Sequence, residues 1–174
     1  MSRLYRMLQE VERPLFLHVN IRWNRNALNW LFHTLSWIAG ATFSLSLSLI
    51  IALFASGIWS TVGWQAFAAI IISHIPVAIA KRSAPRLRPY QVFAQANTNS
   101  KPLKDPSFPS GHTTAAFAML TPWMIAEPML ISALLPIGIG VALSRVYFGL
   151  HFPSDTIAGA LLGSSTALLV TLWI

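Results

Sequence analysis

The sequence has no cysteine and very little charge, and each shortage excludes a class of protein. Without cysteine, disulfide bridges and thiolate metal sites are excluded. Charged residues make up 10 % of the 174 residues and hydrophobic residues 55 %, whereas a soluble domain carries about 25 % charge. No Lys, Arg, Asp or Glu occurs from Asn26 through Ala80. This composition excludes an ordinary soluble domain and predicts an all-α helix bundle in a membrane.

Apolar segments cover about residues 27–58, 62–80, 111–126, 129–148 and 156–174. A span needs about 20 residues, so the longer first segment is expected to begin along the interface. We predict a transmembrane domain over residues 27–174 with about five spans, and an N-terminal interfacial arm over residues 1–26. Arg3 to Val19 is interpreted as an amphipathic surface helix, with a loosely ordered tail as the alternative.

Five spans would place the arm, the loop after Lys81 and the break at His151 on one membrane face, and the C-terminus on the other. Gly159 and Gly163 form a small-xxx-small pair in the last span, which predicts close packing against another helix.

The net charge of +7 is concentrated before the first span and in the loop after the second. Because this charge lies among spans, the expected partners are membrane lipids and a phosphate-bearing substrate, and no nucleic acid. Some of the loop cations are expected to be solvated or to face headgroups: Arg82, Arg86, Lys101 and Lys104.

Three clusters of polar residues on the predicted loop face carry the chemistry. They are Lys81 with Arg88-Pro89, Pro109-Ser110-Gly111-His112, and Ser144-Arg145 with His151 and Asp155. Arginine holds a phosphate bidentately and lysine acts as a point charge. A serine that caps a helix, followed by glycine, leaves free backbone N–H groups that favour an anion. These parts predict a phosphate cradle that needs no metal.

Two histidines accompany the cradle. Asp155 follows His151 by four residues, close enough to accept a hydrogen bond from one ring nitrogen and leave the other free to attack. His112 is then the candidate general acid. The competing interpretations are structural histidines for both, a span-end anchor for Arg145 and a helix N-terminal carboxylate for Asp155.

The three clusters, in this order and spacing, resemble the signature of the type 2 phosphatidic acid phosphatase superfamily over about Asn26 to Gly163. The resemblance implies a helical bundle and a phosphohistidine on His151, oriented by Asp155, with His112 as general acid. It implies phosphate binding by Lys81, Arg88, Ser110, Gly111 and Arg145, with no metal or other cofactor. Many bacterial members have six spans; this chain resembles the shorter members.

The expected function is hydrolysis of a lipid phosphate or diphosphate, with undecaprenyl diphosphate favoured because the chain is short. Alternative substrates are phosphatidylglycerol phosphate, phosphatidic acid and lipid A phosphate. A lipid phosphotransferase and a non-enzymatic carrier of lipid phosphates are the competing functions. The basic residues place the active face in the cytoplasm by the positive-inside rule. The family resemblance places it on the periplasmic or extracytoplasmic face of the inner membrane, which we adopt as the expectation.

Overall fold

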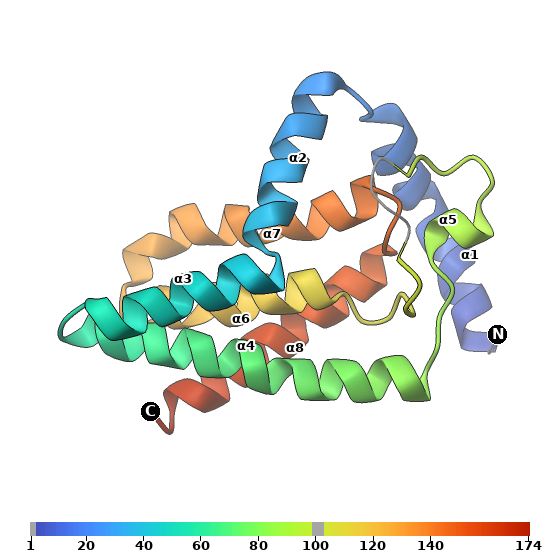
Figure 1. Cartoon of the computed structure of the whole chain (residues 1–174). Coiled ribbons are helices and arrows are strands. Elements are labelled where there is room, and N and C mark those ends of the chain that lie inside the picture. The colour runs from blue at the N-terminus through green and yellow to red at the C-terminus, as the bar shows by residue number, and fades with distance from the viewer. Residues whose placement is uncertain (1–2, 99–102) are drawn as a thin grey trace.

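The computed structural model describes residues 3–98 and 103–174, and these residues form helices and connecting loops with no strand (Figure 1). In chain order the helices are α1 (Arg3–Leu17), η1 (His18–Arg22), α2 (Asn26–Ile38), α3 (Ala41–Phe54), α4 (Ile58–Ser83), α5 (Pro89–Val92), α6 (Gly111–Ala126), η2 (Pro128–Leu130), α7 (Ile131–Tyr147) and α8 (Pro153–Thr171). The predicted all-α class is confirmed.

Two helical segments of the described chain, Ile58–Ser83 and Pro128–Tyr147, are long and apolar enough to cross a membrane. The first predicted segment is not one straight helix, because α2 and α3 meet at an angle of 56°. At the bend the Gly40 N–H donates to the Trp37 carbonyl, three residues back, at 2.9 Å. Glycine is a poor helix former, so the chain changes direction here. If the bent pair of α2 and α3 is counted as one span, the described residues contain three candidate spans.

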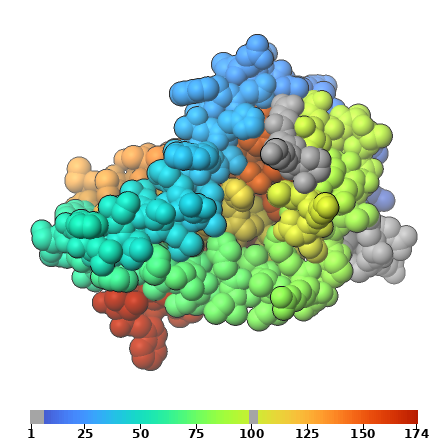
Figure 2. All heavy atoms as spheres, viewed as in Figure 1, coloured from blue at the N-terminus to red at the C-terminus, as the bar shows by residue number. Residues whose placement is uncertain are grey.

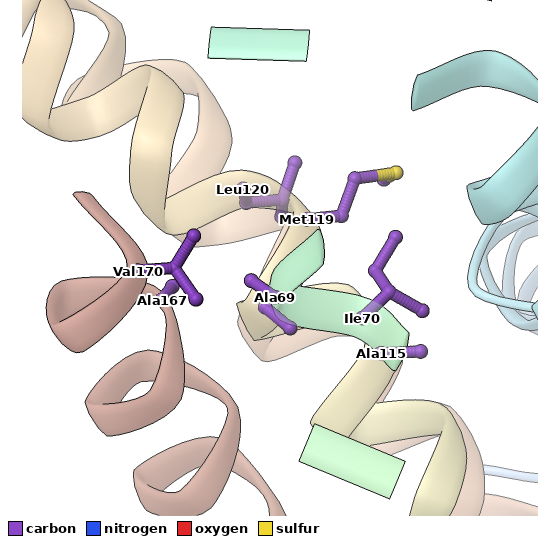
Figure 3. Packing of buried hydrophobic residues seen from close by; sticks show 8 residues of the cluster. Ala69, Ile70, Ala115, Met119, Leu120, Ala167 and Val170 are labelled. Atoms are coloured by element: carbon purple, nitrogen blue, oxygen red, sulfur yellow. The ribbon is translucent and has the colours of Figure 1, made fainter. Parts of the chain in front are cut away.

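Helix α6 lies in the centre of the bundle and packs against α4, α7 and α8. Figure 3 shows the core where α4, α6 and α8 meet, built largely from small side chains such as Ala69, Ala115 and Ala167. A Cβ added to Gly159 would lie 2.6 Å from the Ser110 carbonyl oxygen, and one added to Gly163 would clash with the Thr114 carbonyl. The close packing predicted for this glycine pair is therefore confirmed.

The two ends of the bundle differ in what they carry (Figure 1). Helix α1, the loop that follows α4 and the short break before α8 lie at one end, and the C-terminus lies at the other. The predicted helix in the N-terminal arm is present as α1, with Met7, Val11 and Leu15 exposed along one side. The polar residues of the three clusters are thereby gathered at a single end of the bundle.

Candidate active site

His151 is placed by the way α7 ends. Gly149 adopts a positive φ of 69°, a conformation that glycine takes without steric cost. This turn directs the N–H groups of Leu150 and His151 back to the Arg145 carbonyl, at 3.1 and 3.2 Å. Pro153 then begins α8. The side chain of His151 is held inside the protein, 2 % exposed.

The hydrogen bonds of His151 determine which nitrogen carries the proton. Its Nδ1 lies 2.7 Å from the carbonyl oxygen of Ser107, which can only accept, so Nδ1 is the donor. Its Nε2 lies 3.1 Å from Nη1 of Arg88, which can only donate. The Nε2 lone pair therefore points toward the cations of the site, as a nucleophile for phosphorus must.

Burial keeps this imidazole neutral. It lowers the pKa of His151 to about 4, and the positive charge of Arg88 acts in the same direction, while the Asp155 carboxylate opposes both. A free histidine titrates near 6.5, so the ring retains its lone pair well below neutral pH.

Arg88 is almost fully buried and spans the site. Its Nη1 donates to the Leu150 carbonyl at 2.7 Å, and its Nε donates to the Asp105 carbonyl at 2.8 Å. Its Nη2 donates to the Asp105 carboxylate at 2.9 Å. Lys81, from the end of α4, also donates to this carboxylate and to the Pro106 carbonyl. The first cluster therefore meets the third, as the sequence predicts.

Asp105 was not predicted as a site residue. Burial raises the pKa of this carboxyl, but the hydrogen bond from Lys81 and the charges of Arg88 and Lys81 outweigh that effect and leave the pKa below its usual value. Its side chain is 48 % exposed, more than that of either cation with which it pairs. The sequence did contain one indication of its role, because Asp105 is a lone acidic residue in a strongly basic loop.

Arg145 supplies the third cation. Its Nη1 donates to Ser36 Oγ of α2 at 2.5 Å. Its Nε is buried and has no hydrogen-bond partner among the described residues. His112, at the start of α6, lies close enough to Arg145 and His151 for electrostatic interaction. The second cluster thus adjoins the other two, and Arg145 retains a donor for an anion.

Ser110 caps α6, as predicted: its Oγ accepts from the Thr113 N–H at 3.4 Å. Its own N–H donates to the Asp155 carbonyl at 3.0 Å, and the residue is fully buried. Gly111 differs, because a Cβ built on it would meet no atom within 4 Å. Figure 2 shows a hollow between α2, α4 and the loop before α6, with yellow atoms of α6 at its floor. The glycine therefore faces space that a ligand can occupy.

Asp155 lies beside His151, but the expected direct hydrogen bond is absent. Its Oδ2 is 3.8 Å from His151 Nδ1. The same oxygen accepts instead from Ser107 Oγ at 2.5 Å and from the Phe152 N–H at 2.8 Å. Ser107 thus stands between them, because its backbone carbonyl holds the ring while its hydroxyl holds the carboxylate. No motif in the sequence marked this serine.

Arg86 was predicted to be solvated, and that prediction is wrong. Its side chain is 0 % exposed, and Nη1 donates to Asp155 Oδ1 at 2.7 Å. No pattern in the sequence distinguishes Arg86 from the neighbouring loop cations, because only the fold brings Asp155 to it. Arg82 and Lys104 are exposed, as predicted, and Lys101 lies outside the described residues.

The arrangement suits an anion better than a metal ion. Among the described residues, His, Asp and Glu form no group of three that could ligate a metal. Lys81, Arg88 and Arg145 would repel a divalent cation, whereas they balance the charge of a phosphate. A phosphoryl group within reach of His151 Nε2 would have cations and a second histidine around it.

Comparisons with known proteins agree with this geometry. Lipid A 1-phosphatase of Rhizobium johnstonii is 30 % identical over 118 residues, which cover 65 % of this chain and 48 % of that protein. Decaprenylphosphoryl-5-phosphoribose phosphatase of Mycobacterium tuberculosis is 32 % identical over 114 residues, which cover 64 % of this chain and 59 % of that protein. The chain thus spans about half the length of the curated relatives it matches.

The fold is shared with a solved structure, that of Aquifex aeolicus LpxE, at a TM-score of 0.84 and 23 % identity. That likeness covers 94 % of this chain and 96 % of the other. Residues 62–174 match the PAP2 superfamily, and these residues include all three polar clusters. The chain therefore belongs to the PAP2 superfamily.

Proposed function

We propose that this protein is a membrane phosphatase that hydrolyses a lipid phosphate or diphosphate through a phosphohistidine on His151, without a metal. The observation that carries the proposal is the fixed tautomer of His151. Nδ1 is committed to the Ser107 carbonyl, so the Nε2 lone pair is directed at the cations. A neutral nitrogen nucleophile beside phosphate-binding cations is the arrangement that phosphoryl transfer to histidine needs.

In the first step, Nε2 of His151 attacks phosphorus and forms the P–N bond while the bond from phosphorus to the lipid oxygen breaks. We assign the proton for the departing oxygen to His112; the cations around this ring favour its neutral form, and the negative charge of the bound substrate is needed to offset them. The guanidinium of Arg88 transfers its hydrogen bond from Nε2 to a phosphoryl oxygen. Lys81, Arg145 and the Gly111 N–H stabilise the charge that develops on the other oxygens.

In the second step, water attacks the phosphohistidine. His112, now neutral, takes a proton from the water as the new P–O bond forms. The P–N bond breaks, its electron pair returns to His151 and inorganic phosphate leaves. The sum is one water consumed, with one lipid alcohol or lipid monophosphate and one phosphate produced. Asp155 supports the transient charge on His151 through Ser107.

Undecaprenyl diphosphate is the substrate we test first; the relative named decaprenylphosphoryl-5-phosphoribose phosphatase supports a lipid with a polyprenyl chain. The relative named lipid A 1-phosphatase favours a second candidate, the 1-phosphate of lipid A. Phosphatidylglycerol phosphate and phosphatidic acid complete the panel. The shared chemistry is a terminal phosphoryl group on a membrane lipid.

Phosphate release by the purified protein in detergent with EDTA tests the proposal. The wild-type protein is expected to release phosphate from at least one lipid of the panel, and the His151→Ala variant from none. Dependence on a divalent metal, or full activity of His151→Ala, would refute the mechanism.

The fate of the phosphate separates the competing functions. With a labelled terminal phosphate, a phosphatase delivers the label to water, whereas a phosphotransferase delivers it to a second lipid. A carrier would bind the lipid and release no label at all. We also propose that the active site faces the periplasmic or extracytoplasmic side of the inner membrane, in line with the family resemblance.

A further inference from the structure

The N-terminal arm reaches the active site through a buried carboxylate. Glu12 of α1 accepts from Ser154 Oγ at 2.8 Å through Oε1, and from the Ser154 N–H at 3.0 Å through Oε2. Its Oε1 also accepts from Arg86 Nη2 at 3.3 Å. Only 10 % of the Glu12 side chain is exposed. An acidic residue on a surface arm is rarely so enclosed unless it is paired.

Arg86 connects Glu12 to Asp155. Its Nη1 donates both to Ser154 Oγ and to Asp155 Oδ1, each at 2.7 Å. Its guanidinium lies over the Phe152 ring, 4.1 Å from the centroid, and Phe16 of α1 packs against that ring at 5.9 Å. The Arg86 side chain is 0 % exposed, and its Nη1 and Nη2 are already committed to Ser154, Asp155 and Glu12, so we place it behind Asp155 and not among the phosphate ligands. It holds the first turn of α8 against α1.

A continuous chain of contacts therefore runs from the arm to the nucleophile. Glu12 holds Arg86, Arg86 holds one oxygen of Asp155, and the other oxygen of Asp155 holds Ser107 Oγ. The Ser107 carbonyl fixes the His151 ring. Each link is a hydrogen bond between buried groups, where such bonds are strong and the loss of a partner is costly.

We propose that Glu12 and Arg86 are positioning residues for the proposed phosphatase reaction, and that helix α1 is the part of the fold that orients Asp155 and His151. The outer side of α1 supports this role, because Met7, Val11 and Leu15 are exposed at intervals of four residues. Such a stripe fits the apolar layer of a membrane interface. In this arrangement the membrane interface anchors α1, and α1 in turn orients Asp155 and His151.

The test compares two isosteric changes on one helix. Glu12→Gln removes the buried charge, and Glu10→Gln removes an equal charge from an exposed position of α1. We expect Glu12→Gln to lower kcat about tenfold and to change KM by no more than about twofold. Losses of this size are seen when the hydrogen-bond partners that orient metal-binding residues are removed from other enzymes. Glu10→Gln is expected to leave both constants unchanged. Unchanged kcat in Glu12→Gln with only a lower Tm would overturn the proposal.

A double-mutant cycle tests whether Glu12 acts through Arg86. Arg86→Lys keeps the charge but loses the planar fork whose two terminal nitrogens reach Asp155 and Glu12 separately. The variant carrying both changes is expected to show the same reduction of kcat as Arg86→Lys alone. If the reduction in the double variant instead equals the product of the two single reductions, Glu12 does not act through Arg86. Should Glu12→Gln not fold, Ser154→Ala removes the hydroxyl between Glu12 and Arg86 and leaves both charges in place. It is expected to lower kcat, and unaltered kcat would overturn the proposal.

Binding of vanadate separates this inference from the proposed function on which it rests. Vanadate adopts the geometry of phosphoryl transfer at a nucleophilic nitrogen, and its binding is measured by thermal shift without any lipid. The proposal predicts weaker vanadate binding in Glu12→Gln than in Glu10→Gln. If no lipid is hydrolysed but this difference appears, the substrate assignment fails and the positioning role stands. Equal binding in the two variants contradicts the positioning role.

Discussion

At the scale of single residues, the site depends on where protons and small side chains are placed. Burial keeps His151 neutral and the Ser107 carbonyl fixes its tautomer, while a Cβ added to Gly111 would meet no atom within 4 Å. Each feature can be tested with a single substitution.

The depressed pKa of His151 predicts how stability changes with pH. In the unfolded chain the ring takes up a proton near pH 6.5, while in the folded protein it does so only near pH 4. Between these values the unfolded state binds more protons, so stability falls as the pH falls from about 6.5 to about 4. Thermal unfolding in detergent should show this slope, and His151→Gln should reduce it. An equal slope in both proteins would contradict the assigned pKa.

Gly111→Ala tests whether the hollow beside α6 holds the phosphoryl group. The added methyl group meets no protein atom within 4 Å, so Tm should change little. Catalysis should fall by about tenfold or more, because the methyl group occupies the space of the ligand and a tenfold loss needs only about 1.4 kcal/mol. Gly159→Ala is the contrasting variant, since its methyl group meets the Ser110 backbone, and it should lower Tm. Normal kcat/KM in Gly111→Ala would remove the glycine from the binding site.

At the scale of elements, the loop between α4 and α6 carries an acidic residue, Asp105, that we expect to compete with a phosphate for the same cations. Asp105 pairs with Lys81 and Arg88, the cations expected to bind phosphate. Replacing it by asparagine removes one unit of negative charge, worth about 1 kcal/mol at about 4 Å in a wet site. The inhibition constant of inorganic phosphate for Asp105→Asn should therefore fall about fivefold. Pro106→Ala, which keeps the carboxylate, is the control, and an unchanged constant in Asp105→Asn would exclude competition.

The helices were predictable because hydrophobicity and motif spacing are local properties. The predicted segment at 111–126 is α6, and Ser110 caps it as the sequence indicates. The bend at Gly40 was missed because one apolar run covers both α2 and α3, and composition alone does not reveal a change of direction.

The network behind the nucleophile was predictable only in part. The spacing of His151 and Asp155 predicted that they lie together, and they do. Ser107 and Arg86 come from a loop whose path depends on tertiary contacts, and Glu12 comes from the far end of the sequence. Such residues are brought to a site by folding, and no short motif marks them.

At the scale of the whole molecule, the polar clusters, the arm and the long loop share one end of the bundle (Figure 1). The side of the membrane on which this end lies decides which pool of lipid phosphate the proposed active site can meet. The arginines of the arm favour the cytoplasm, whereas the family resemblance favours the opposite side.

Labelling of single cysteines determines the orientation, because the chain has no cysteine of its own. Ser83 is exposed at the active-site end of α4, and Ser56 is exposed in the turn at the other end. In intact cells, an impermeant thiol reagent should label Ser83→Cys and spare Ser56→Cys. The reverse pattern would place the active site in the cytoplasm.

The central claim is a covalent phosphohistidine on His151, and trapping it is the most direct measurement. The protein is mixed with a lipid that carries a labelled terminal phosphate and is quenched in alkali with EDTA present. The proposed mechanism predicts label on the protein that survives alkali, is lost in acid, maps to His151 and is absent from His151→Ala. Phosphate release from the lipid with no such label on the wild-type protein, or label that persists in His151→Ala, would contradict it.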